Sequence, residues 1–259
     1  MNELLLPTSY LPPVSYLALL IGRSSATVEV CETFPKQTHR NRCEILTSNG
    51  IMRLSVPVVR TNGNHTLTQD IAISYAERWN IQHIRAIESA YNTAPYFLYL
   101  WDPLKAILLE RHERLIDLNA KLMDYLLSKL SIKCQLSYSE EYLSGQQTAD
   151  STQLLDLRDM FAHNKGINPI EQPSTPAPIN VSTNSAIKSE QSESLLSFSH
   201  RSRMTPNGDN QRINISTYQH PYYQIWADRH GFCPNLSIID LLFNLGPAES
   251  RDYLKAIIK

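Results

Sequence analysis

A long polar segment between residues 144 and 210 interrupts the chain and limits how the rest can fold. Serine, threonine, proline, glutamine and asparagine dominate this segment, as in QPSTPAPINVSTNSAIKSEQSES. Such a composition offers too little apolar surface to offset the entropy lost on ordering. We therefore predict a disordered insert over 144–210 in a single domain, with residues 1–143 forming an α/β core and residues 211–259 completing it.

The N-terminal part has the pattern of a Rossmann-like strand–helix–strand unit. Leu4–Leu6 is a short apolar run that predicts a strand. Pro12 and Pro13 suit the first turn of a helix, which we expect to end near Gly22. Ala26–Cys31 then alternates apolar and polar residues, as a half-buried strand does.

Further strands and helices follow along the chain. Strands mixed with helices favour an α/β fold with a mixed sheet and helices packed on it. The expected elements are strands over Ile51–Val58, Leu67–Ile73 and Ile132–Leu136, a helix over Trp79–Tyr91, a long helix opening at Asp102-Pro103, one helical turn in Leu154–Phe161, and a C-terminal helix closed by Gly246-Pro247.

Composition and missing motifs exclude several function classes. The formal net charge is −1 and the estimated pI is 6.7, which does not indicate a nucleic-acid binder. No stretch reaches the roughly 18 apolar residues of a membrane span, so we expect a cytoplasmic protein. The sequence has no CxxC pair, no GxGxxG or GxxxxGK[ST] phosphate loop, and no GxSxG or HExxH. We predict neither a cofactor nor a metal site.

The first candidate site is a basic loop. His39, Arg40, Asn41 and Arg42 follow one another after a predicted strand. Paired guanidinium donors are suited to clamp a phosphate or carboxylate, so these four residues are predicted to bind a small anionic substrate. The alternative is a solvated basic loop in a nearly neutral protein.

The second candidate lies on one helix. Trp79, His83 and Tyr91 fall along one side of it. A histidine flanked by aromatic residues can serve as general acid or base, so His83 is a predicted catalytic residue and Trp79 and Tyr91 are predicted substrate contacts. A core histidine with aromatic neighbours gives the same pattern.

The third candidate is a pair of polar residues, Asp240 and Asn244, one turn apart on an apolar helix. A buried aspartate needs partners, and an arginine of the basic loop is the expected one. We predict Asp240 as catalytic and Asn244 as substrate-binding, with a purely structural pair as the alternative. The YQHPYYQ stretch, Tyr218–Gln224, either lines a small-molecule pocket or is a packed connection.

Together, these segments resemble the WbqC-like protein family, in particular the branch found in Bacteroidetes bacteria. The resemblance covers both parts of the chain that flank the insert. The segments that carry it are SYLPPVSYLALL (Ser9–Leu20), ETFPKQTHRNRC (Glu32–Cys43), HRNRCEI (His39–Ile45), LSVPV (Leu54–Val58), the helix and loop Trp79–Phe97, and PNLSIIDLLFNLGP (Pro234–Pro247).

The resemblance implies a bacterial cytoplasmic protein connected with surface polysaccharides. It supports a first hypothesis, a transferase acting on activated sugars or acyl donors. A second hypothesis is a non-catalytic binding or assembly protein that captures a protein partner through the polar insert. A third, a Rossmann-like nucleotide transferase related to adenylyltransferases, lacks the histidine motif that those enzymes carry after the first strand.

Overall fold

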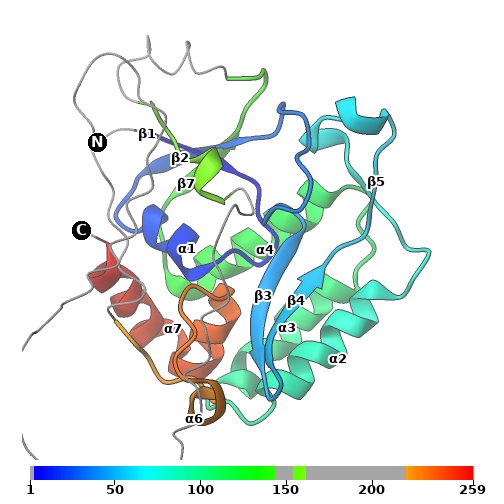
Figure 1. Ribbon diagram of the computed structural model, residues 1–259. Coiled ribbons are helices and arrows are strands. Elements are labelled where there is room, and N and C mark those ends of the chain that lie inside the picture. Colours follow the sequence, from blue (N-terminus) through cyan, green and yellow to red (C-terminus); the bar gives the residue numbers. More distant parts are fainter. Residues whose placement is uncertain (1–2, 144–153, 162–219, 259) are drawn as a thin grey trace, which may run out of the picture.

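A parallel four-stranded sheet forms the upper part of the computed structural model, which describes residues 3–143, 154–161 and 220–258 (Figure 1). The strand order is β7-β2-β1-β8, and each neighbouring pair is parallel. This confirms the predicted α/β fold and its Rossmann-like start. The strands are β1 (Glu3–Pro7), β2 (Ser25–Glu29), β7 (Gln135–Tyr138) and β8 (Leu154–Asp156).

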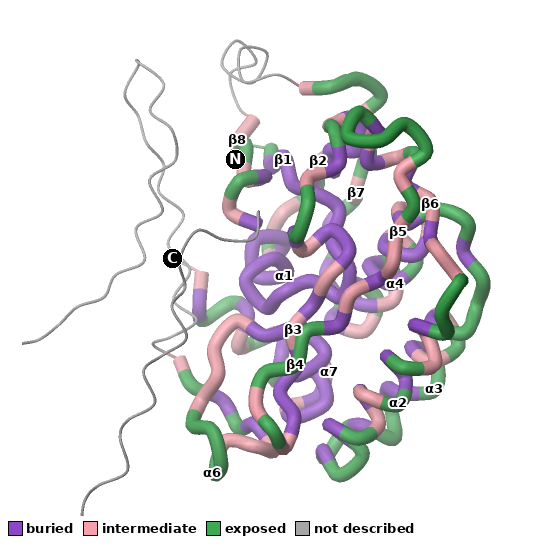
Figure 2. Tube along the Cα trace, turned by 45° about the vertical axis from the view of Figure 1, so that its right-hand side comes forward, coloured by how far each residue is buried: buried purple, intermediate pink, exposed green. Residues whose placement is uncertain are grey.

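Two helices pack against the same face of this sheet. They are α1 (Val14–Leu20), which is buried along its whole length, and α4 (Leu115–Leu130) (Figure 2). Tyr16 of α1 and Met123 of α4 line a common hollow with Val28 of β2, which places both helices beneath one face. α1 follows the predicted prolines, with Pro13 as the residue that precedes it.

Two short antiparallel pairs extend the fold beyond the main sheet. The hairpin of β3 (Arg42–Thr47) and β4 (Gly50–Ser55) turns at the predicted Asn49-Gly50 position. β5 (Val58–Val59) pairs with β6 (Ala72–Ile73). The predicted strand over Leu67–Ile73 is largely wrong, because Thr68–Asp70 is a 3-10 helix, η2. Thr68 in η2 and Ile71 just after it are both buried and lie three residues apart, a spacing that fits a 3-10 turn better than a strand. A further 3-10 turn, η1, covers Gly63–His65.

The central helices are α2 (Trp79–Tyr91), as predicted, and α3 (Phe97–Leu109). The prediction of one long helix opening at Asp102-Pro103 is wrong, because Pro103 lies inside α3 and α4 is a separate helix. Proline cannot donate to the carbonyl four residues earlier, that of Tyr99. Tyr99 is 79% exposed, so its carbonyl lies on the solvent side of the helix, where a missing bond costs little.

The C-terminal part contains α6 (Ala227–His230) and α7 (Ile238–Ile257), and α7 packs against α1, α3 and α4. The predicted break at Gly246-Pro247 is present, since Gly246 has φ 78° and ψ 172°. The chain then resumes its helix as far as Ile257, which the sequence did not predict.

Most of the predicted insert, 144–210, lies outside the described residues. Its one described piece, Leu154–Phe161, forms strand β8 and the 3-10 helix η3 (Arg158–Phe161) in place of a single helical turn. β8 pairs with β1 in parallel, with Leu4 opposite Leu155. A piece of the polar segment therefore contributes an edge strand to the main sheet.

Candidate functional site

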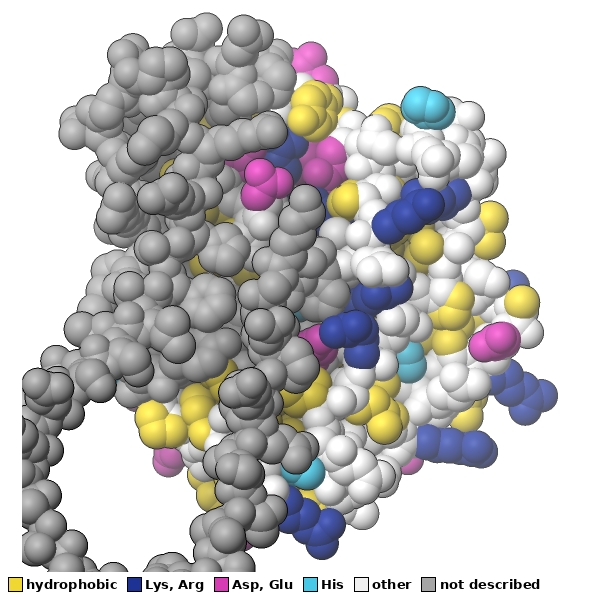
Figure 3. Space-filling model, in the orientation of Figure 1, with side chains coloured by type: hydrophobic (Ala, Val, Ile, Leu, Met, Phe, Trp, Pro, Cys, Tyr) yellow, Lys and Arg dark blue, Asp and Glu magenta, His cyan; other side chains and the backbone are white. Residues whose placement is uncertain are grey.

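The carboxyl ends of the four parallel strands meet at one edge of the main sheet. Thr8 follows β1, Glu29 ends β2, Ser139 follows β7 and Arg158 follows β8. From β1 the chain continues to β2 and then β7 on one side of β1, whereas β8 is the neighbour of β1 on its other side. The direction in which strands are added therefore reverses between β1 and β8, which makes this a topological switch point. Open α/β sheets bind ligands at such an edge. In Figure 3 acidic and basic side chains meet near the top of the described surface, in the region of the sheet.

The first turn of α1 is already occupied by the protein itself. The Val14 amide donates to the Leu236 carbonyl at 3.0 Å, and the Ser15 amide donates to Asn235 Oδ1 at 2.9 Å. A Rossmann-type phosphate site uses free amides at this position. The segment before α7 takes that place here, which counts against the adenylyltransferase-like alternative.

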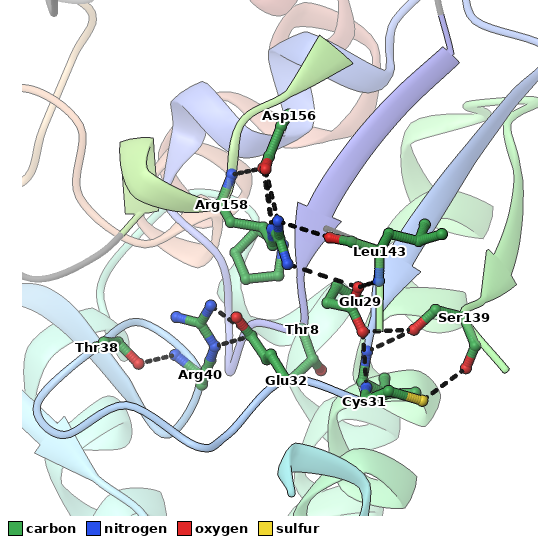
Figure 4. A network of polar contacts seen from close by, with 12 residues as sticks. Thr8, Glu29, Cys31, Glu32, Thr38, Arg40, Ser139, Leu143, Asp156 and Arg158 are labelled. Atoms are coloured by element: carbon green, nitrogen blue, oxygen red, sulfur yellow. Dashed lines mark hydrogen bonds and ion pairs between the residues drawn. The ribbon is translucent and has the colours of Figure 1, made fainter. Parts of the chain in front are cut away.

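Glu29 organises one side of the sheet edge. Its carboxylate is fully buried and accepts hydrogen bonds from the Cys31 amide (2.7 Å), the Ser139 hydroxyl (2.7 Å) and the Leu143 amide (3.1 Å). Arg158 Nη1 lies 3.6 Å from its Oε2 (Figure 4). A buried carboxylate with this many donors is held in place and ties the ends of β2 and β7 to the η3 segment.

Arg158 lies between two acidic residues at this edge (Figure 4). Its Nη2 is 2.6 Å from Asp156 Oδ2 and also donates to the Leu143 carbonyl at 3.0 Å. Its guanidinium carbon is 5.1 Å from the centre of the Tyr142 ring. These contacts fix a cation at the carboxyl end of β8, on the switch-point side of the sheet.

Arg40 and Glu32 form a second ion pair beside Thr8 (Figure 4). Nε of Arg40 lies 2.6 Å from Glu32 Oε1, and the arginine side chain is only 2% exposed. Its Nη1 is buried and has no hydrogen-bond partner within the described ranges. Burial raises the pKa of Glu32, and Arg40 lowers it by less. The site thus combines an unsatisfied buried donor with a carboxyl group that takes up a proton readily.

A small hollow with a mostly apolar lining lies beside Thr8 and Asn119. Asn119 of α4 donates from Nδ2 to the Thr8 hydroxyl (3.1 Å) and to the Arg40 carbonyl (2.8 Å). Its Oδ1 is buried and unpartnered within the described part of the chain. The hollow is lined by Thr8, Ser9, Tyr16, Val28, Asn119, Ala120, Met123, Leu136 and Tyr138.

The four residues of the predicted anion-binding loop lie in two different parts of the structure. Arg40 belongs to the sheet edge, and His39 lies near it, with its ring 6.5 Å from that of Phe161. Asn41 instead donates to the Val56 carbonyl at 2.9 Å, and Arg42 begins β3 opposite Ser55. Asn41 and Arg42 therefore belong to the β3–β4 hairpin, away from the Arg40–Glu32 pair.

The predicted histidine is part of the interior. His83 is buried between Trp79, with ring centres 5.1 Å apart, and Tyr10, whose hydroxyl is 2.9 Å from Nδ1. Burial lowers the pKa of His83 to about 4, with a backbone hydrogen bond at Ser55 acting in the opposite direction. Trp79 and His83 are thus core residues with a neutral imidazole.

Asp240 has tyrosine partners, and the prediction of an arginine partner is wrong. Its carboxylate is fully buried and accepts hydrogen bonds from Tyr91 (2.8 Å), Tyr222 (2.6 Å) and Gln224 (2.9 Å). Burial raises its pKa to about 6, although these three hydrogen bonds lower it. Asn244 donates to the Asp240 carbonyl at 2.8 Å. The structure brings Tyr91, Asp240 and Asn244 together, but as a buried cluster apart from the sheet edge.

Several residues of the sheet edge were not among the predicted site residues. Asn119 had a visible signal, because it shares a helix face with Leu115 and Leu122 and interrupts an apolar stripe. Arg158 was assigned to the insert, and Glu29 and Glu32 carry no motif of their own. Their common position at strand ends becomes apparent only from the sheet order.

Neither a metal cluster nor a membrane-spanning helix occurs among the residues that the structure describes. No three His, Cys, Asp or Glu side chains gather there as a metal site would require. None of the helices in the same ranges is both long and apolar enough to cross a membrane.

Comparison with known proteins identifies the family. The model of the WbqC-like protein family matches residues 8–174, more than half of the chain. The chain belongs to the WbqC-like protein family. It is 28% identical over 255 residues to the uncharacterised protein Rv1507c of Mycobacterium tuberculosis. This alignment covers 96% of our chain and 95% of that relative. No solved structure matches the chain.

The extent of the WbqC-like match separates the two polar clusters. Residues 8–174 include the sheet-edge residues Thr8, Glu29, Glu32, Arg40, Asn119 and Arg158. Asp240 and Asn244 lie outside this range, as does the Pro234–Pro247 motif that contributes to the resemblance. The family assignment thus rests on the segment that contains the sheet edge. The Bacteroidetes branch stays a prediction.

Proposed function

We propose that this WbqC-like protein is a transferase that binds an anionic donor, a nucleotide sugar or an acyl donor, at the carboxyl edge of its parallel sheet. One observation carries the proposal. Arg40 is almost fully buried there, yet its Nη1 has no acceptor among the described residues. A buried donor without an acceptor is costly, and a phosphate or carboxylate oxygen would satisfy it.

Two features of the edge support chemistry on such a donor. The charges of Arg40 and Arg158 are held by Glu32, Glu29 and Asp156, so they need little reorganisation when a ligand arrives. Glu32 has a raised pKa and contacts Arg40 directly, which suits it to take a proton from an acceptor hydroxyl. In this proposal Arg40 holds the anion and Glu32 is the base.

The proposal assigns structural positions to most of the other predicted residues. His83, Asp240, Tyr91 and Asn244 are buried and bonded to protein groups, so in this proposal they stabilise the fold and do not contact the donor. We place the reaction in bacterial surface-polysaccharide metabolism and the protein in the cytoplasm. The four cysteines are free thiols, the state that a reducing compartment maintains.

Ligand binding tests the proposal with two arginine variants. Wild type, Arg40→Lys and Arg42→Lys are titrated calorimetrically with nucleotide sugars and with acetyl-coenzyme A. Lysine keeps a positive charge beside Glu32 but loses the guanidinium fork that reaches a second acceptor. We expect Arg40→Lys to bind at least tenfold more weakly. Arg42→Lys is the matched control, because Arg42 lies on the hairpin, and it should bind like wild type.

Two results of these titrations would overturn the proposal. If wild type binds none of these donors, or if Arg40→Lys binds them as tightly as Arg42→Lys does, the anion site at the sheet edge is wrong.

A further inference from the structure

The hollow beside Asn119 presents one acceptor and one donor that have no partner in the described part of the chain. Asn119 is 1% exposed, and its Oδ1 has no partner within the described residues. The orientation of the amide is fixed, because Nδ2 faces two acceptors, the Thr8 hydroxyl and the Arg40 carbonyl. The free atom is therefore the carbonyl oxygen of the side chain, which can only accept.

Thr8 supplies the complementary donor. Its Oγ1 accepts the hydrogen bond from Asn119 Nδ2, and its hydroxyl proton has no acceptor in residues 3–143, 154–161 and 220–258, so it is available to donate. Thr8 and Asn119 both line the same hollow. A group that fits between them must accept one hydrogen bond and donate another.

A hydroxyl is the smallest organic group that does both from a single atom. We infer that the Thr8–Asn119 hollow binds a hydroxyl group of the donor, and that this donor is an activated sugar. The inference rests on the proposed function, because Asn119 also donates to the backbone carbonyl of Arg40, the residue whose side chain forms the anion site. An activated sugar carries both hydroxyl groups and a phosphate, the two kinds of group that these sites would bind.

The rest of the lining is mostly apolar and largely buried, with Val28 3% and Met123 5% exposed. Val28, Leu136 and Met123 present hydrocarbon surface, and Tyr138 is 40% exposed at the rim. The hollow is small, so it has room for the hydroxyl group alone and leaves the rest of the ligand outside.

Matched ligand pairs test the inference. Calorimetry compares UDP-glucose with UDP and GDP-mannose with GDP, on wild type, Thr8→Val and Thr8→Ser. We expect wild type to bind at least one nucleotide sugar roughly tenfold more tightly than its diphosphate. Thr8→Val keeps the side-chain shape but removes the hydroxyl, so it should lose that preference and still bind the diphosphate. Thr8→Ser should retain the preference.

The possible outcomes separate this inference from the proposed function. If wild type binds each diphosphate as tightly as its sugar, or if Thr8→Val keeps the preference, the hollow holds only water and the hydroxyl site is wrong. In that case the proposed anion site remains supported if Arg40→Lys binds every ligand more weakly than wild type does. If wild type binds neither sugars nor diphosphates but does bind acetyl-coenzyme A, the sugar inference fails and the transferase proposal survives. Binding of no donor overturns both.

Discussion

Glu32 and Arg40 form a buried ion pair in which Oε1 of the glutamate lies 2.6 Å from Nε of the arginine. Their side chains are 13% and 2% exposed, so neither charge can be solvated well if the other is removed. Burial raises the pKa of Glu32 and lowers that of Arg40, which shows that desolvation opposes both charges. The pair must therefore be kept or lost together.

We expect each single replacement, Glu32→Gln or Arg40→Met, to lower the free energy of unfolding by about 2–4 kcal/mol. The double variant Glu32→Gln/Arg40→Met should lose less free energy of unfolding than the two single variants lose in sum, because no uncompensated charge remains. Urea denaturation at pH 7 measures all three free energies. The exposed pair Arg114–Asp117 is the control, and replacing either residue by alanine should change stability by less than ~1 kcal/mol. Additive losses at Glu32 and Arg40 would contradict the coupling.

The sequence predicted the local elements of the fold better than their assembly. The apolar run Leu4–Leu6, the prolines before α1 and the alternation in Ala26–Cys31 identify β1, α1 and β2, because each is a short-range pattern. β8 was missed because three residues, Leu154–Asp156, are too short to show a period. They become a strand only by pairing with β1.

The candidate site was predicted less well, since it depends on contacts between distant segments. Arg40 was identified from its loop, but its partner Glu32 and its neighbour Asn119 are set by tertiary packing. Asp240 was expected to pair with an arginine, whereas its partners include the buried residues Tyr222 and Gln224. A pattern shows that a buried aspartate needs partners but does not say which residues provide them.

Two buried groups should give stability opposite dependences on pH. Asp240 has a pKa of about 6 against an ordinary value of 3.8, so the folded state holds its proton more tightly. Its contribution is complete below pH 4 and is lost as the pH rises through 6. His83 has a pKa of about 4 against 6.5, so its contribution is complete above pH 6.5 and is lost as the pH falls toward 4. Between pH 4 and 6 the two largely cancel.

Replacing one of these two groups should reveal how the other makes stability depend on pH. In Asp240→Asn the free energy of unfolding should fall more steeply than in wild type as the pH drops from 6 to 4, by up to about 1.4 kcal/mol per pH unit. In His83→Gln it should instead rise over the same range. Denaturant unfolding at half-unit pH steps gives the difference curves. Parallel curves for wild type and both variants would show that neither group has a shifted pKa.

Gly246 should tolerate no side chain. Its φ of 78° is unfavourable for other residues, and a Cβ placed there would lie 2.6 Å from Cε1 of Tyr96. We expect Gly246→Ala to lower the free energy of unfolding by about 2–4 kcal/mol. Gly22→Ala is the control. Gly22 also has a positive φ (72°), but a Cβ at that position would meet no atom within 4 Å. We therefore expect Gly22→Ala to lower the free energy of unfolding by only about 1 kcal/mol. Equal losses in thermal or urea unfolding would show that Tyr96 imposes no steric limit.

The Tyr222–Asp240 hydrogen bond should matter most when the carboxyl group is charged. The tyrosine hydroxyl donates to Asp240 at 2.6 Å and lowers its pKa, so Tyr222→Phe should raise that pKa above 6. A bond to a charged group contributes about 1.5–3 kcal/mol and a bond to a neutral group about 1 kcal/mol. We therefore expect Tyr222→Phe to lose more stability at pH 8 than at pH 4.

Tyr253 is the matched control for this difference, because its hydroxyl donates to a neutral acceptor, the His220 carbonyl, at 2.6 Å. Tyr253→Phe should therefore lose a similar amount of stability at both pH values, since its acceptor does not titrate. Urea unfolding of both variants and wild type at pH 4 and pH 8 gives the comparison. A Tyr222→Phe loss that is the same at both pH values would mean that Asp240 does not ionise in the folded protein over this range, and the assigned pKa of about 6 would be wrong.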